Sequence, residues 1–121
     1  MSKIQSCRDL IVWKEAMNPI EMIYKATLNY PKTEIFGLTS QTRRAAVSIA
    51  ANIAEGYGRS HRKEYLNHLS IAKGSLLEVE THLLIANRIG YITRETLLPI
   101  WELSQTVGKL LSALQKSLTI P

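Results

Sequence analysis

Residues 61–89 read HRKEYLNHLSIAKGSLLEVETHLLIANRI, and this stretch decides the fold. Apolar residues recur along it at alternating steps of four and three, without the alternation of a strand. They are Tyr65, Leu69, Ala72, Leu76, Val79, Leu83 and Ala86. This spacing is typical of helices that pack lengthwise at about +20°. The stretch therefore predicts a long helix, which Ser60 caps and Gly90 ends.

Three further helices are predicted around this one, at about residues 9–29, 39–57 and 94–117. Apolar stripes with helical spacing mark the first and the last: Leu10, Trp13, Met17, Ile20 and Tyr24, then Ile100, Leu103, Val107, Leu110 and Leu114. The links between helices are mostly short, which favours antiparallel neighbours. The predicted fold class is all-α, an antiparallel up-down-up-down four-helix bundle that forms a single domain over residues 1–121.

The helix at 39–57 has an inward face of mostly small residues, which lets a neighbouring helix approach closely. That face comprises Ala45, Ala46, Ile49, Ala50, Ile53 and Ala54. Gly56 and Gly58 are interpreted as stop signals at the end of this helix. Gly74 lies inside the helix at 61–89, where glycine costs roughly 1 kcal/mol against alanine. We therefore expect a tight helix crossing at Gly74.

Composition excludes several classes of protein. The chain has 121 residues, 45% of them hydrophobic, which suffices for one core without metal or disulfide support. Its single cysteine, Cys7, cannot form an internal bridge. No segment reaches the roughly 18 apolar residues that span a bilayer, and the first residues do not resemble a secretion signal. These features predict a cytoplasmic protein with no membrane partner.

The apolar surface exceeds what one four-helix core can cover. The surplus residues are Ile11, Val12 and Ile23 on the first helix and Leu77, Leu84 and Ile85 on the third. Surplus apolar surface of this kind is typical of a subunit interface. The chain is therefore expected to associate with copies of itself.

Four of the five excess positive charges fall in residues 39–63. This stretch holds five bases, Arg43, Arg44, Arg59, Arg62 and Lys63, and a single acid. Such a local positive field attracts polyanions, and the nearby Tyr57 and Tyr65 can stack on unpaired bases. We therefore predict a nucleic-acid contact, although a solvated helix face explains the same charges. The two groups of bases lie at opposite ends of one rod, so a shared basic rim needs several subunits.

A polar stripe with helical spacing crosses the same region. Its members are Gln41, Arg44, Ser48, Asn52, Glu55 and Arg59. An assembly role is predicted for Arg44, Ser48, Asn52 and Glu55, with Arg44 pairing with Glu55 of its own chain or of a neighbouring copy.

Catalytic and metal chemistry find little support in the sequence. A di-iron bundle needs Glu-x-x-His on two helices, whereas the acid-to-histidine spacing at Glu64 and at Glu78 is four, both on one helix. Cys7 has no recognisable activating neighbour. The Gly56-Tyr57-Gly58 run lacks the Gly-Lys-Ser/Thr of a phosphate loop. The predictions are therefore no catalytic residues, no metal and no cofactor, and a protein that is not an enzyme.

Several motifs together resemble a known family. They are Asp9-Leu10-x-Val12-Trp13-Lys14; Gly37-Leu38-Thr39-Ser40-Gln41-x-Arg43-Arg44-Ala45-Ala46-Val47-Ser48-Ile49-x-x-Asn52-Ile53-Ala54-Glu55-Gly56-x-Gly58-Arg59; Lys63-Glu64-Tyr65-Leu66; Ala72-x-Gly74-Ser75; and Glu78-x-Glu80-Thr81-x-Leu83. Over roughly residues 9–92 the chain resembles the bacterial four-helix-bundle proteins encoded in 23S rRNA intervening sequences. It departs from their pattern at Cys7, Phe36 and Ala50.

The resemblance implies a homopentameric, barrel-like ring with a role on RNA or DNA. The family is also similar in fold to the accessory variability proteins of diversity-generating retroelements, which bind nucleic acid and a reverse transcriptase. The family motif falls on Arg43, Arg44, Ser48, Asn52, Glu55, Gly56 and Arg59. The leading hypothesis is a non-enzymatic nucleic-acid-binding oligomer. The alternative is a protein-interaction adaptor, for example one that docks a reverse transcriptase as a retroelement accessory factor.

Overall fold

A computed structural model of the chain describes residues 6–119, which contain helices and no strand. The four helices are α1 (Ile11–Thr27), α2 (Leu38–Tyr57), α3 (Arg62–Arg88) and α4 (Arg94–Thr119). Two short 3₁₀ turns, η1 (Cys7–Asp9) and η2 (Lys32–Glu34), precede α1 and α2. The prediction of an all-α protein with four helices is confirmed for these residues.

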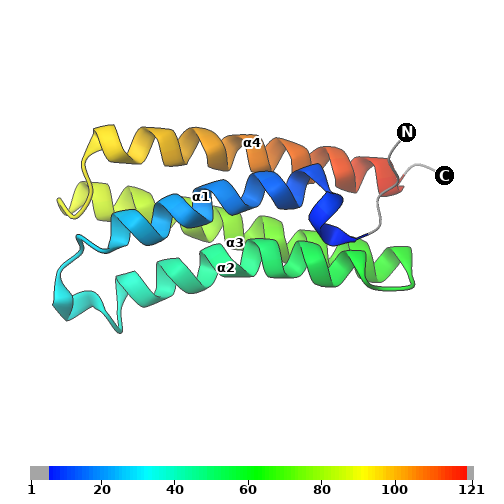
Figure 1. Cartoon of the computed structure of the whole chain (residues 1–121), viewed down its shortest axis with the longest axis horizontal. Helices are drawn as coiled ribbons and strands as arrows, with labels where there is room; N and C mark the ends of the chain where they lie inside the picture. Colours follow the sequence, from blue (N-terminus) through cyan, green and yellow to red (C-terminus); the bar gives the residue numbers. More distant parts are fainter. Residues whose placement is uncertain (1–5, 120–121) are drawn as a thin grey trace.

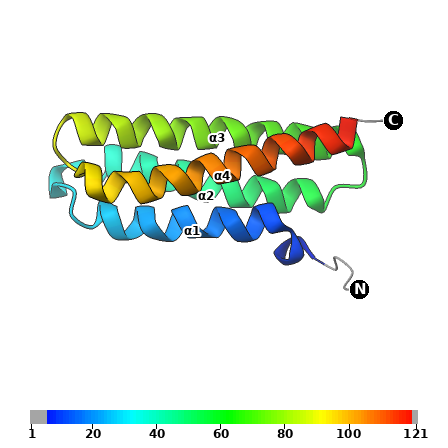
Figure 2. The same cartoon turned by 90° about the horizontal axis from the view of Figure 1, so that it is seen from above.

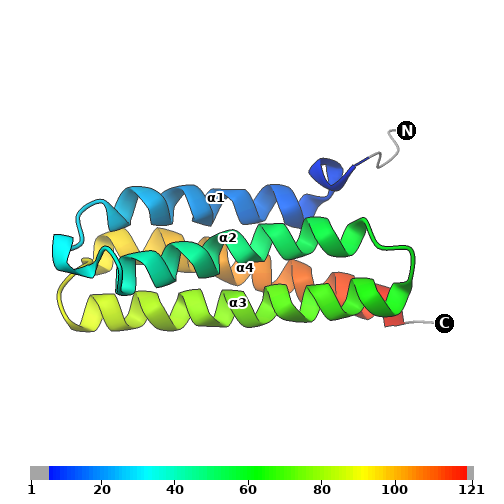
Figure 3. The same ribbon diagram turned by 90° about the horizontal axis from the view of Figure 1, so that it is seen from below.

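The four helices lie side by side along the long axis of the molecule (Figure 1). The α1–α2 and α3–α4 connections lie at one end of the bundle, and the α2–α3 turn lies at the other (Figures 1 and 2). Within the described residues, α1 packs on α2 and α4, and α3 also packs on both, while no contacts cross the diagonals. The view from below, opposite to that of Figure 2, shows the same arrangement, with α4 behind α2 and α3 (Figure 3).

The core confirms the predicted face of α3 and only part of the stripes of α1 and α4, of which Leu10, Ile20, Ile100 and Val107 are buried. Every heptad residue of α3 is buried except Tyr65, which is half-buried. In α1 the buried face is rotated from the predicted one, because Val12, Ala16 and Ile23 fill the centre of the bundle. Predicted core residues Trp13 and Met17 instead line an open apolar groove of about 260 Å³ between α1 and α2. In α4, Ser104 and Leu111 are buried, whereas Leu103 and Leu110 of the predicted stripe are half-buried.

The surplus apolar surface is smaller on α1 than predicted. Val12 and Ile23 belong to the core, so of the three α1 residues only Ile11 is exposed. On α3 the side chains of Leu77, Leu84 and Ile85 are exposed, as predicted.

A carboxylate from the preceding loop begins α2. Glu34 Oε1 accepts a hydrogen bond from the Leu38 backbone N–H at 3.0 Å, so the helix starts one residue earlier than predicted. Glu34 Oε2 accepts the Tyr91 hydroxyl at 2.8 Å, which ties the loop to the α3–α4 turn. These two hydrogen bonds, that of Leu38 first, lower the pKa of Glu34, and the bond to Glu34 raises the pKa of Tyr91.

The first helix ends at Thr27, two residues before the predicted end. Leu28 and Asn29 still bond back to carbonyl groups three residues earlier, so the backbone continues as a tight turn rather than as α-helix.

Gly58 and Gly90 lie at the ends of α2 and α3 as predicted, whereas Gly56 and Gly74 do not have the roles predicted for them. Gly56 lies inside α2, and a Cβ built there would stand 2.8 Å from the Cβ of His68 and 3.0 Å from Tyr65 Cδ1 on α3. Gly74 faces open space, with nothing within 4 Å of a Cβ. The close crossing of α2 and α3 is therefore at Gly56, not at Gly74. The glycine with a left-handed backbone is Gly90, which ends α3 (φ 85°).

Candidate nucleic-acid interface

The predicted basic residues lie in two groups at different ends of the bundle. Arg43 and Arg44 are in the first half of α2, on the side of the α1–α2 connection, and Arg59, Arg62 and Lys63 surround the α2–α3 turn (Figure 1). One chain therefore does not bring the two groups into a single pocket. Each group has to be assessed by the partners that its own side chains make.

Arg43 is engaged within the chain. Its Nε donates to Thr27 Oγ1 at 2.8 Å, and one Nη donates to the Tyr24 carbonyl at 3.2 Å. The guanidinium carbon also lies 4.7 Å from the centre of the Tyr24 ring, within cation–π range. Arg43 therefore satisfies carbonyl and hydroxyl oxygens at the C-terminal end of α1 and holds that end on α2.

Arg59 is partly neutralised by two carboxylates. It forms an ion pair with Glu55, four residues earlier on the same helix, and lies 3.8 Å from a Glu64 oxygen. Glu55 therefore pairs with Arg59 and not with Arg44 of the same chain, because positions 44 and 55 are eleven residues apart, about 16.5 Å along the helix axis. The pairs are solvent-exposed and so contribute little stability.

Arg62 and Lys63 form the unpaired part of the basic group. Both side chains are exposed in the first turn of α3, and neither has an ion-pair or hydrogen-bond partner within residues 6–119. Exposed His61 precedes them. Cations at a helix N-terminus lack the favourable dipole that a C-terminus offers, so this position does not stabilise the helix.

The two tyrosines near this turn contact each other. Tyr57 and Tyr65 are half-buried, with ring centres 6.3 Å apart and planes at 83°. This edge-to-face contact joins the end of α2 to the start of α3. Burial, followed by the neighbouring Tyr57, raises the pKa of Tyr65.

Most of the polar stripe on α2 is used within the chain. Ser48 and Ser75 hydroxyls are 2.8 Å apart, and the Asn52 amide donates to the Ser48 carbonyl at 2.9 Å. The Asn52 carbonyl oxygen lies 3.1 Å from Nδ1 of His68. These side chains, together with Gly56, form a polar seam between α2 and α3. Thr42 and His82 continue the seam towards the other end of the bundle, where Nδ1 of His82 lies 3.4 Å from the Thr42 hydroxyl.

Arg44 is a member of the stripe that stays outside this seam. Its side chain is exposed and has no partner within the described part of the chain. It borders an open polar groove between α2 and α3 that Ser48, Ser75 and Glu78 also line.

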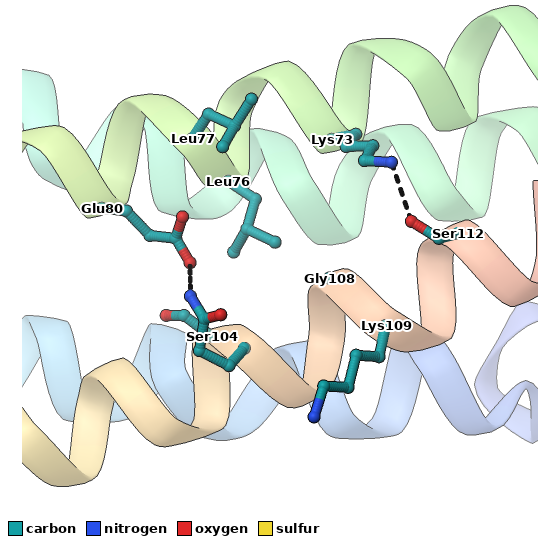
Figure 4. A pocket seen from close by; sticks show the side chains of 9 residues that line it. Lys73, Leu76, Leu77, Glu80, Ser104, Gly108, Lys109 and Ser112 are labelled. Atoms are coloured by element: carbon teal, nitrogen blue, oxygen red, sulfur yellow. Dashed lines mark hydrogen bonds between the residues drawn. The ribbon is translucent and has the colours of Figure 1, made fainter.

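A further groove, which the sequence did not predict, lies between α3 and α4 (Figure 4). It has a volume of about 400 Å³, and Leu77, Glu80, Ser104 and Gly108 are among its lining residues. Glu80 is only 8% exposed and reaches across to accept the Gln105 amide at 2.8 Å. Burial raises the pKa of Glu80, and the bond to Gln105 acts in the opposite direction.

No basic side chain of the described residues pairs with Glu80. Lys73 donates to the Ser112 hydroxyl at 2.7 Å, and the Lys109 side chain points away from the groove (Figure 4). Ser104 is fully buried, and its hydroxyl has no hydrogen-bond partner. The feature of the sequence that could have indicated this groove is Glu80, an acid directly after the heptad residue Val79.

The described residues contain no group of three or more histidine, cysteine, aspartate or glutamate side chains placed to hold a metal ion. None of the helices over residues 6–119 combines the length and hydropathy that a membrane crossing requires.

Comparison with protein families identifies the family of the chain. The profile of the 23S rRNA-intervening sequence proteins matches residues 8–113, most of the sequence. The chain belongs to this family. A crystal structure of a protein of unknown function from the S23 ribosomal protein family of Bacteroides thetaiotaomicron VPI-5482 is similar in fold, with a TM-score of 0.79 and 31% sequence identity. The alignment covers 88% of this chain and 99% of that one.

Comparison with curated proteins finds no match. The family match includes every basic residue considered above, the polar seam and the α3–α4 groove. Membership in the 23S rRNA-intervening sequence family therefore establishes the fold and the relatives of the chain. The exposed charges and unpaired groups of the chain are the features that bear on its function.

Proposed function

We propose that this 23S rRNA-intervening sequence protein is a non-enzymatic nucleic-acid-binding oligomer. In this proposal, up-down-up-down bundles associate side by side into a homo-oligomeric ring, a pentamer by family resemblance. The α2–α3 turns then gather at one rim of the ring. The observation that carries the proposal is the exposed, unpaired state of Arg62 and Lys63 at that turn, in a chain with a net charge of +5.

The chemistry of the turn favours phosphate as its ligand. When unpaired lysine and arginine neutralise phosphates, counterions are released from the nucleic acid. The resulting affinity depends on salt concentration and little on the nucleotide sequence. Arg59 adds a third cation, whose weak exposed pairs compete with phosphate. The proposal assigns no phosphate contact to Arg43, because its donors are used within the chain.

The test is the salt dependence of binding to a single-stranded oligonucleotide in a filter-binding assay. Replacing Arg62 and Lys63 together by alanine is expected to lower affinity and to flatten the slope of log K against log[salt] by about 1.4, since each phosphate contact contributes about 0.7.

The matched control is the double substitution Lys14→Ala with Lys25→Ala, which removes the same charge from exposed positions of α1. It should leave the slope unchanged. Absence of binding at low salt, or an equal loss in both double variants, would count against the proposed interface.

A second candidate function is the adaptor, favoured by an apolar surface at the end with the α1–α2 connection. Phe36 is 93% exposed there, and Leu28 and Ile35 are exposed beside it. An adaptor keeps its protein partner after nuclease treatment, whereas a protein tethered through nucleic acid is released. Under this alternative the partner is a protein such as a reverse transcriptase.

A further inference from the structure

A buried carboxylate on α3 and an exposed guanidinium on α2 lack ionic partners among the described residues. Glu80 lies in the α3–α4 groove with one hydrogen bond to its carboxylate, from Gln105. A buried carboxylate without a cation is costly, because water no longer solvates it. Arg44 is an exposed guanidinium on α2 with no partner among residues 6–119. Each group supplies what the other lacks.

The two groups lie at nearly the same height along the bundle. The Thr42–His82 and Ser48–Ser75 contacts fix how α2 and α3 align, and they place Arg44 beside Glu78. Glu80 follows two residues later, about 3 Å along the axis. A rotation about an axis parallel to the bundle, without translation along it, can therefore bring Arg44 of one copy to Glu80 of the next.

The surroundings of both groups suit a subunit contact. Beside Arg44, Val47 is 45% exposed, and the groove rim carries Leu77, which is 58% exposed. Ser104 also lines the groove, and its buried hydroxyl has no hydrogen-bond partner among the described residues. Arginine suits this position, because its planar group stays charged and binds carboxylates through two parallel hydrogen bonds.

We propose that the occupant of the α3–α4 groove is a second copy of this chain, with Arg44 of one copy paired with Glu80 of the next. The inference rests on the proposed ring and identifies its interface. Two different surfaces of the chain meet in this contact, so it is heterologous. A heterologous contact without axial translation closes into a ring when the rotation between neighbouring copies divides a full turn evenly.

The decisive experiment is cross-linking between copies. In a chain with Cys7→Ser, cysteines replace Val47 and Leu77, which leaves Arg44 and Glu80 intact, and a short bismaleimide joins thiols that approach each other. Each copy then has one reactive position on each surface, so the proposal expects a ladder of covalent oligomers that ends at the ring size. A dimer without higher species would indicate a two-fold contact, and a linked monomer a contact within one chain; both outcomes overturn the proposal.

The control for cross-linking pairs the cysteine at Val47 with one at Ser70. Ser70 is also exposed on α3, but it lies seven residues from Leu77, about 10 Å along the axis. This pair is expected to give no ladder. A ladder equal to that of the Val47–Leu77 pair would show that cross-linking does not depend on the proposed alignment, which also overturns it.

Charge variants test the pair itself. Glu80→Gln keeps the side-chain size and removes the charge, and it is expected to weaken association by about 30-fold or more, as loss of one partner from a buried charge pair does. Glu78→Gln, which removes an exposed carboxylate near Arg44, is expected to leave association unchanged. Equal effects of the two variants would contradict the assignment.

These results separate the interface from the ring. If the unmodified chain is monomeric in sedimentation analysis, the ring itself fails. If it forms a ring that neither the cross-link nor Glu80→Gln detects, the ring stands and this interface is wrong.

Discussion

Replacing Gly56 by alanine is expected to destabilise the protein by about 1 kcal/mol, although alanine is the better helix former. The added methyl group would meet the ring of Tyr65 and the Cβ of His68, and that Cβ cannot move without shifting α3. Overpacking of this kind costs about 1–3 kcal/mol, from which the roughly 1 kcal/mol gained in helix propensity is subtracted. Thermal unfolding should show a fall in Tm of roughly 4 °C.

Gly74→Ala provides the matched control, because it makes the same chemical change on the open side of α3. It gains helix propensity without a clash, so the expected effect is a stabilisation of about 0.5–1 kcal/mol. The two substitutions should thus shift Tm in opposite directions. Stabilisation by both would show that α2 and α3 do not approach as closely as the structure has them.

Replacing Arg43 by alanine is expected to cost about 2 kcal/mol of unfolding free energy. The change removes two hydrogen bonds to α1 and the cation–π contact with Tyr24. Hydrogen bonds to charged groups contribute about 1.5–3 kcal/mol, and an exposed cation–π contact adds about 0.5–1 kcal/mol. The hydrogen bond to the Tyr24 carbonyl is exposed to solvent, which lowers its contribution to this sum. Urea unfolding measures the loss.

Arg88→Ala is the comparison for Arg43, because Arg88 is exposed in the last turn of α3 and has no partner among the described residues. Its loss should cost less than about 0.5 kcal/mol. Arg43→Lys should recover only part of the stability, since lysine lacks the planar fork that reaches both oxygens. Equal losses for Arg43 and Arg88 would remove the structural role assigned to Arg43.

The sequence predicted the helices better than the faces they bury. On α3 the heptad sets a single inward direction, and the structure confirms it. On α1 two overlapping stripes are apolar, and only the packing against both α2 and α4 decides that Ile23 is inside and Met17 at the rim. Periodicity alone cannot choose between stripes when each contains enough apolar residues.

The roles of single residues depended on neighbours that are distant in sequence. A glycine next to the end of a helix reads as a stop signal, but Gly56 is required by His68 and Tyr65, whose height on α3 the sequence does not state. Likewise, Arg43 and Arg44 are adjacent and chemically identical, yet one is bound to α1 and the other is free. Charge counts identified the basic region without separating these two residues.

The most direct test of the account is native mass spectrometry of the unmodified chain with a short single-stranded oligonucleotide. The account predicts an assembly of several 13.6 kDa copies, five by family resemblance, whose mass increases by that of the bound oligonucleotide. A 13.6 kDa monomer that binds no oligonucleotide at low salt would contradict both the ring and its basic rim.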